Sequence, residues 1–355
     1  EELKKKIAYY KQVLSDEGMV LSIIKDEIGV IRQKYADERR TEITADENDL
    51  EVEDLIADED VVITISHTGY IKRVPMDTYK SQKRGGKGIT GMTTKEEDFV
   101  EQLFITSTHN YLMFFTNNGK CYRVKVYDIP ETSRTSKGTA VVNLINIGND
   151  EKITAVISVK NFAEEKYLLA VTRHGYVKKT ILNEYDSSRK DGLIAINLEE
   201  GDELVKVALT DGKQELLLVT AYGMAIRFSE EEVRPIGRTG QGVHGITLEK
   251  GDYVQAMDIV RADSQVLVIT ENGYGKRTKI DEYRAQSRGG KGIQTIKESK
   301  RNGNIVDMLI LKDGEEILAV TTEGIIIRLQ VADITSSGRA TMGVLLMRLG
   351  ENDKV

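Results

Sequence analysis

The chain has 355 residues, 40% of them hydrophobic, which is enough for a folded core and too many for one small domain. One cysteine, Cys121, excludes a disulfide framework, and no apolar run is long enough to cross a membrane, so we expect a cytoplasmic protein without membrane contact. The net charge of −7 argues against a nucleic-acid partner bound by a globally basic surface.

Residues 1–36 are predicted to be helical, because apolar residues recur every three or four positions from Leu3 to Tyr35. A break is expected at Ser15-Asp16-Glu17, which has the form of an N-cap followed by an acidic first turn. The pattern is typical of a helical hairpin or the end of a coiled coil, and residues 1–47 form this part together with a linker. Because the chain starts within the helical pattern, we expect it to be a segment of a longer protein.

Charge is unevenly distributed along the rest of the chain. Residues 48–60 hold seven acidic residues and no basic one, whereas residues 61–355 hold 41 basic and 39 acidic residues. Any anion-binding surface in this part must therefore be a local patch or stripe.

From residue 61 a unit of about 50 residues recurs six times. Each unit contains a predicted strand, the turn pattern Ser/Thr-x-x-Gly, and a second predicted strand. The hairpin glycines are Gly69, Gly119, Gly175, Gly223, Gly273 and Gly324. Gly suits a turn that requires positive φ. Several strands in each repeat predict an all-β, propeller-like array of six four-stranded blades over residues 48–355, with a linear β-solenoid as the lesser alternative.

Two positions in the repeat carry basic residues: four residues after each hairpin glycine, and four residues before a second glycine that closes the repeat. In a blade array these positions lie at equivalent places around the rim, where a regular cationic band suits the phosphates of duplex DNA. The alternative is that they are solvated strand positions or pair with acidic neighbours, although no Glu occurs at either position. The predicted DNA-binding rim comprises Arg73, Arg123, Arg134, Lys137, Lys179, Arg189, Arg227, Arg238, Arg277, Arg328 and Arg339.

Two glycine-rich boxes occupy the same slot in repeats one and five. The first box is Gln82, Lys83, Arg84, Gly85, Gly86, Lys87 and Gly88. The second box is Gln286, Ser287, Arg288, Gly289, Gly290, Lys291 and Gly292. Glycines allow backbone N–H groups to approach phosphate oxygens, and the cations add charge, so we predict that both boxes bind DNA.

Other motif interpretations fail on context. The stretch GKGITG fits G-x-G-x-x-G, but no helix pattern and no βαβ unit follows it. The four histidines and the cysteine lack metal-ligand spacing, and no catalytic constellation recurs, so neither a metal site nor a catalytic residue is predicted.

The box QKRGGKG resembles the QRRGGKG heptapeptide in the C-terminal domain of the DNA gyrase A family, and Lys83 is the one departure from it. This family belongs to the type IIA topoisomerases. The six repeats are similar to the β-pinwheel blades of that family, and DERRTEI at 37–43 resembles the end of its coiled coil. The resemblance implies a domain without catalytic residues or a cofactor, which wraps duplex DNA in a positive sense. It also implies a parent enzyme that uses ATP and Mg²⁺ elsewhere and assembles from gyrase B together with a second gyrase A chain, while this segment alone is monomeric.

Three other functions remain open. The second strong box disfavours, without excluding, the equivalent domain of topoisomerase IV. A propeller-like platform for an acidic protein would use the same rim. A propeller enzyme ranks last, because no carboxylate or histidine occupies a shared position in the repeats.

Overall fold

The structure is a computed structural model that describes residues 1–37, 41, 52–76, 100–133, 135–148, 150–187, 191–297, 299–322, 326–351 and 353–355. The chain divides into two compact units, residues 1–55 and residues 56–355.

The first unit contains the helices α1 (Glu2–Ser15) and α2 (Glu17–Tyr35), followed by the short 3-10 helix η1 (Val52–Leu55). The predicted helical start and its break are confirmed. The Asp16 side chain accepts a hydrogen bond from the Gly18 N–H at 2.9 Å, which satisfies one of the unpaired donors at the start of α2. No residue of either helix is buried.

The second unit is all β, and its described residues form five four-stranded sheets and one two-stranded sheet. The first sheet has the order β3 (Val100–Ser107), β1 (Asp60–Ser66), β2 (Tyr70–Pro75), β6 (Thr139–Ala140). The second has the order β10 (Leu193–Ile194), β5 (Lys120–Lys125), β4 (Tyr111–Thr116), β7 (Ile153–Val159). The third has the order β11 (Leu204–Thr210), β8 (Tyr167–Thr172), β9 (Tyr176–Ile181), β14 (Val243–His244).

The remaining sheets follow the same plan. The fourth has the order β15 (Val254–Ile259), β12 (Glu215–Thr220), β13 (Met224–Ser229), β18 (Ile293–Gln294). The fifth has the order β19 (Ile305–Leu311), β16 (Gln265–Thr270), β17 (Tyr274–Lys279), β22 (Val344–Leu345). The last contains only β20 (Glu316–Val320) and β21 (Ile326–Gln330). All these strand pairs are antiparallel. Short 3-10 helices follow the hairpins: η3 (Val126–Asp128), η5 (Leu182–Tyr185), η6 (Glu230–Glu232), η7 (Ile280–Glu282) and η8 (Val331–Asp333), with η4 (Val141–Asn143) after β6.

The prediction of six four-stranded blades is wrong, because the described residues form five such sheets. Each sheet takes its short fourth strand from the next repeat, as β14 pairs with β9, so the number of hairpins does not equal the number of complete sheets. In the sixth repeat, Thr322 N donates to Lys354 O as Asn117 N donates to Lys152 O directly before β7. Val355 therefore corresponds to Ile153, the first residue of β7, in the sixth repeat.

The predicted hairpin turns are confirmed at the five described hairpin glycines, whose φ angles run from 75° at Gly119 to 93° at Gly223. Gly324 lies outside the described residues. The central strands read as continuous apolar runs, such as LLLVT at 216–220, because both faces of each sheet are covered.

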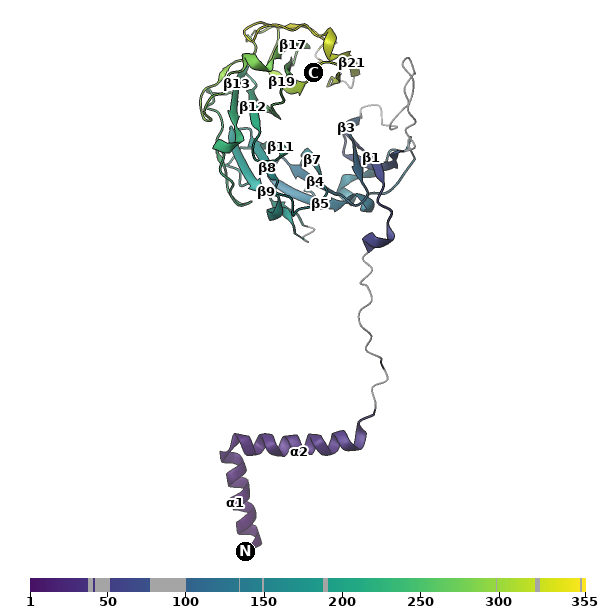
Figure 1. The fold of residues 1–355 in the computed structure, drawn as a ribbon, viewed down its shortest axis with the longest axis vertical. Coiled ribbons are helices and arrows are strands. Elements are labelled where there is room, and N and C mark those ends of the chain that lie inside the picture. The colour runs from purple at the N-terminus through teal and green to yellow at the C-terminus, as the bar shows by residue number, and fades with distance from the viewer. Residues whose placement is uncertain are drawn as a thin grey trace. The chain divides into compact units, whose positions relative to one another are not determined.

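Five apolar clusters fill the spaces between consecutive sheets. Phe114 on β4 and Ile63 on β1, for example, share one cluster. The inner strands β7, β11, β15 and β19 contact one another in sequence. The opposite edge, which carries β10, β14, β18 and β22, is therefore the outer edge of the array (Figure 1).

Candidate nucleic-acid interface

The predicted rim residues that follow the hairpin glycines lie largely inside the array. The side chains of Arg73, Arg123, Arg227 and Arg277 are only 13, 17, 18 and 14% exposed. Lys179 is buried, and its Nζ donates to the Glu230 carbonyl at 2.7 Å.

The hydrogen bonds of two arginines show how the side chain four residues after the hairpin glycine is bound. Nη1 of Arg227 donates to the carbonyls of Ile280 and Tyr283 at 3.2 and 3.1 Å, and its Nη2 donates to Glu215 at 2.6 Å. Nε of Arg277 donates to the Ile334 carbonyl at 2.6 Å in the same way. Each guanidinium thus binds the 3-10 turn of the next repeat to its own strand.

Arg73 makes the same kind of contact as Arg277, whereas Arg123 and Arg328 pair with acidic residues. Arg73 donates to Ile129 O at 3.0 Å and lies 3.7 Å from Glu131. Arg123 pairs with Asp186 at 2.7 Å. Arg328 is 70% exposed and pairs with Glu316. The acidic pairing considered as an alternative is therefore present, although DNA contact by these residues stays a prediction.

Three segments at the outer edge, residues 230–242, 280–292 and 331–343, are called the linking segments here. They join β13 to β14, β17 to β18 and β21 to β22. Consecutive linking segments are tied together, because Glu232 Oε2 accepts the Arg288 N–H at 3.0 Å and Glu282 Oε2 accepts the Arg339 N–H at 3.2 Å. They form a continuous track along the outer edge.

The second set of predicted arginines sits on this track. Nη1 of Arg238, Arg288 and Arg339 donates to the carbonyls of Ile194, His244 and Gln294 at 3.2, 3.1 and 3.1 Å. Each acceptor is the last residue of a short outer strand. A guanidinium has five N–H donors, so part of each remains available to a ligand. Arg134 and Arg189 lie outside the described residues.

The second box forms the C-terminal half of the linking segment 280–292. Gly289 N donates to Gly245 O at 2.7 Å, and Gly289 and Gly292 have φ angles of 79° and 75°. Thr247 Oγ1 donates to Gly289 O at 2.6 Å. Gln286 N donates to Arg227 O at 2.8 Å. These contacts fix the box on the preceding repeat. The first box, residues 82–88, lies outside the described residues.

Four cations on the same edge have neither a hydrogen-bond nor an ion-pair partner for their side chains within the part of the chain that the structure describes. They are Arg234, Lys279, Arg284 and Lys291, and all are exposed. Of these, the sequence analysis named only Lys291. Arg234 and Arg284 stand at the same place in their repeats, two residues after the 3-10 turn, which is the signal that could have identified them.

Three lysines that were not predicted from sequence, Lys72, Lys178 and Lys276, are buried. Their ammonium groups bind backbone carbonyls of the next repeat: Lys72 donates to Ser136 O at 2.9 Å and Lys276 to Gly338 O at 2.5 Å. Burial lowers the pKa of Lys178 to about 7 and that of Lys276 to about 8. In the sequence, each of these lysines directly precedes the basic residue that follows the hairpin glycine by four positions. Such a pair of adjacent basic residues occurs only in repeats one, three and five.

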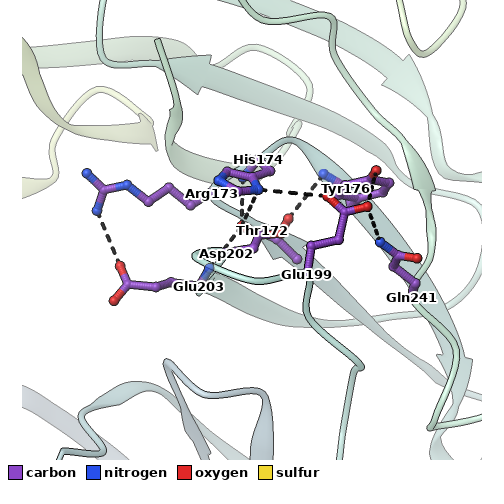
Figure 2. A network of polar contacts seen from close by, with 8 residues as sticks. All are labelled: Thr172, Arg173, His174, Tyr176, Glu199, Asp202, Glu203 and Gln241. Carbon is purple, nitrogen blue, oxygen red and sulfur yellow. Dashed lines mark hydrogen bonds and ion pairs between the residues drawn. The ribbon is translucent and has the colours of Figure 1, made fainter. Parts of the chain in front are cut away.

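The hairpin-turn end of the third repeat has acidic character. Tyr176 Oη and Gln241 Nε2 donate to Glu199 Oε1 at 2.9 and 2.7 Å (Figure 2), and these bonds lower the pKa of Glu199. Asp202 Oδ1 accepts the His174 N–H at 2.8 Å. This end of the repeat is negatively charged and is poorly suited to phosphate.

Within the described ranges, no group of three or more His, Cys, Asp or Glu side chains could hold a metal ion. Among the described helices, none is long and apolar enough to span a membrane.

A family described as DNA gyrase C-terminal domain, beta-propeller, matches residues 60–107, 110–160, 166–211, 214–261, 264–312 and 315–355. The chain belongs to that family. The six matched segments correspond to the six sequence repeats, although they form five complete sheets.

The chain is 53% identical over 354 residues to the DNA gyrase A protein of Clostridium acetobutylicum, and it spans about 43% of that protein's length. A crystal structure of the C-terminal domain of DNA topoisomerase IV is similar, with a TM-score of 0.73 and 32% identity over 82% of this chain and 90% of that one. A structure of the DNA gyrase A C-terminal domain has a TM-score of 0.67 and 27% identity over 83% of this chain and 97% of that one.

Proposed function

We propose that this gyrase C-terminal domain binds duplex DNA along its outer edge and bends it in a positive sense. The observation that carries the proposal is the track of linking segments, which holds cations such as Arg234 and Arg284 that have no partner among the described residues. A row of cations on a curved edge suits a bent phosphate backbone, which it would bind without reading base sequence.

The arrangement accounts for binding by a chain whose net charge is −7. Attraction is local, because Arg234, Arg284 and Lys291 are exposed cations without a partner among the described residues. Two carboxylates of the same track, those of Glu232 and Glu282, already accept backbone N–H groups of the next linking segment. At physiological salt, charges more than about 8 Å apart are largely screened, so phosphates sense mainly the nearby cations.

The domain serves a larger enzyme in this proposal. DNA bent on its outer edge is presented to the strand-passing part of a gyrase, which contains gyrase B together with a second gyrase A chain and introduces negative supercoils in the cytoplasm. ATP and Mg²⁺ act in that larger enzyme, and the domain itself uses neither.

Linking number tests the proposal directly. The chain is incubated with a closed circular plasmid, the plasmid is relaxed with a nicking-closing topoisomerase, and the protein is removed. We expect a positive shift that grows with protein concentration and shrinks in a triple variant, Arg234→Ala, Arg284→Ala, Lys291→Ala. The control variant, Lys250→Ala, changes an exposed cation in the turn before β15. Tight DNA binding with no shift in linking number would overturn wrapping.

A further inference from the structure

The hairpin-turn end of the array is crossed by segments that join a short outer strand to the inner strand that follows it. Three of them are called the crossing segments here: residues 195–203, 245–253 and 295–304. Each begins on one hairpin turn and ends on the next. Thr295 N, for example, donates to Gly223 O at 2.8 Å, and Glu271 N donates to Asn304 O at 2.9 Å. The crossing segments therefore lead from repeat to repeat on this side of the array.

The charge of the crossing segments changes along the array. Residues 195–203 hold four acidic residues and no basic one, and their Glu199 and Asp202 are drawn in Figure 2. Residues 245–253 hold two acidic residues and one basic residue. Residues 295–304 hold three basic residues and one acidic residue. Of the three crossing segments, only the last has a net positive charge.

The cations of this last crossing segment are Lys297, Lys300 and Arg301, and all three are exposed. Over the ranges that the structure describes, the side chains of Lys297 and Lys300 have no hydrogen-bond or ion-pair partner. Glu298, the one acidic residue of the segment, lies outside the described residues. Two ammonium groups on the surface of the hairpin-turn end are thus available to an anion.

Arg301 is held in a fixed orientation beside these lysines. Its guanidinium lies over the ring of Tyr274, 4.4 Å from the ring centre. Its Nε donates to Asn302 Oδ1 at 3.2 Å, and its Nη2 donates to Gly343 O at 3.4 Å. A guanidinium has five N–H donors, so others remain for a ligand. An oriented arginine next to two lysines suits the oxygens of a phosphate backbone.

The crossing segment 295–304 lies directly against the outer-edge track. Lys297 N donates to Thr341 O at 3.0 Å, and Asn302 Nδ2 donates to Met342 O at 2.7 Å, so both bind the linking segment 331–343. In the preceding crossing segment, Thr247 occupies the place of Lys297 and its Oγ1 donates to the track at Gly289 O. Lys297 makes no such side-chain bond, and its charge stays at the surface beside the track.

The track itself loses basic residues at this point. The linking segment 280–292 holds Arg284, Arg288 and Lys291, whereas the linking segment 331–343 holds only Arg339. Nη1 of Arg339 already donates to Gln294 O at 3.1 Å. The row of cations that follows the outer edge through the fourth and fifth repeats therefore continues on the crossing segment 295–304, at the hairpin-turn end.

We propose that a duplex bound along the outer edge leaves it at the linking segment 331–343 and continues over the hairpin-turn end, where Lys297, Lys300 and Arg301 bind its phosphates. This inference rests on the DNA binding proposed above and adds the path of the duplex. A duplex bent within one plane has no writhe, so a shift in linking number requires a rise along the axis of the array. The three cations set the direction of that rise.

A tethered cleavage reagent locates the duplex. Iron-EDTA is attached to the full chain at Lys300→Cys, while Cys121 is buried and stays unmodified. The hydroxyl radicals that it generates should cleave bound linear DNA several-fold more than those from Lys250→Cys, which lies at the same place in the crossing segment 245–253. Equal cleavage from the two positions, or none from Lys300→Cys, would overturn the proposed path.

Charge removal measures what the contact contributes. The double variant Lys297→Ala, Lys300→Ala should reduce the magnitude of the slope of log affinity against log salt by about 2, since each phosphate contact contributes about 0.9. Its shift in plasmid linking number should be at least about twofold smaller than that of the wild type, because the duplex no longer rises from the plane. The charge-matched control Lys213→Ala, Lys250→Ala changes two other exposed lysines and should retain both values. Thermal midpoints of both variants should equal that of the wild type.

The outcomes separate this path from DNA binding itself. A wild-type chain that neither shifts the linking number nor loses affinity with salt would overturn the proposed function and the path together. A wild-type shift that the folded double variant Lys297→Ala, Lys300→Ala retains in full, with an unchanged salt slope, would overturn the path alone. The three cations would then be left to an acidic protein partner.

Discussion

Nη1 of Arg288 donates to the carbonyl of His244 at 3.1 Å, and the same bond recurs from Arg238 to Ile194 and from Arg339 to Gln294. An arginine of the second box is therefore a structural contact between repeats as well as a candidate phosphate ligand. The two roles are compatible, because a guanidinium fixed by one carbonyl keeps other N–H donors in a defined direction. Mutation of such a residue would confound binding with folding.

The exposed cations of the track allow a cleaner measurement. Each phosphate contact contributes about 0.9 to the slope of log affinity against log salt. The triple variant Arg234→Ala, Arg284→Ala, Lys291→Ala should therefore lower the magnitude of that slope by about 2 to 3 with linear duplex DNA. Its thermal midpoint should stay at the wild-type value. An unchanged slope would exclude these three side chains from the interface and favour a protein platform over a DNA track.

The arginines that bind the 3-10 turn of the next repeat, such as Arg227, should affect stability more than DNA binding. Arg227→Ala leaves the carbonyls of Ile280 and Tyr283 without their donor, and we expect it to lower the free energy of unfolding by about 2 to 3 kcal/mol. Arg328→Ala removes an exposed pair with Glu316 and should cost less than about 1 kcal/mol. Urea denaturation of both variants measures the difference. Equal losses of unfolding free energy in the two variants would contradict a structural role for Arg227 between repeats.

Lys276 should make stability depend on pH. Burial lowers its pKa from 10.5 to about 8, so between these values the unfolded chain binds a proton that the folded chain lacks. Stability contributed by this group is lowest below pH 8 and rises as the pH increases toward 10.5. Relative to the Lys276→Met variant, which lacks the titrating group, the free energy of unfolding of the wild type should rise by about 2 kcal/mol between pH 7 and 10. Denaturation midpoints of the two proteins at several pH values measure it, and parallel pH profiles would contradict it.

The local turns of this fold could be predicted from sequence, because positive φ at residues such as Gly119 leaves a direct mark on residue choice. The number of blades could not be obtained by counting hairpins. A strand such as β14 pairs with β9 of the preceding repeat, and sequence does not reveal which repeat a two-residue strand joins.

The recurrence of basic residues in the repeat could be found from sequence, but the contacts that these residues make could not. The absence of Glu at the two basic positions is compatible with phosphate binding, but carbonyl acceptors such as Ile280 O and His244 O also require a donor and equally exclude Glu. A repeated residue in an array can contact the neighbouring repeat or a ligand with the same periodicity. Exposure separates the two roles: Arg277 is 14% exposed, whereas Arg284 lies on the surface.

The closing glycines of the repeats offer the sharpest test of how the track is held. Gly242 has a φ of 104°, and a Cβ atom there would lie 2.7 Å from the carbonyl oxygen of Val177. Gly242→Ala should therefore destabilise the protein by about 2 kcal/mol or more, because both the turn and the close approach to β9 are lost. Gly237→Ala, five residues earlier in the same linking segment, has open space around it and should change stability by less than about 0.5 kcal/mol. Thermal melts of the two variants measure this contrast. Similar midpoints for both would mean that the linking segment can shift away from β9 without loss, and a track that yields so easily could not hold DNA in a fixed curve.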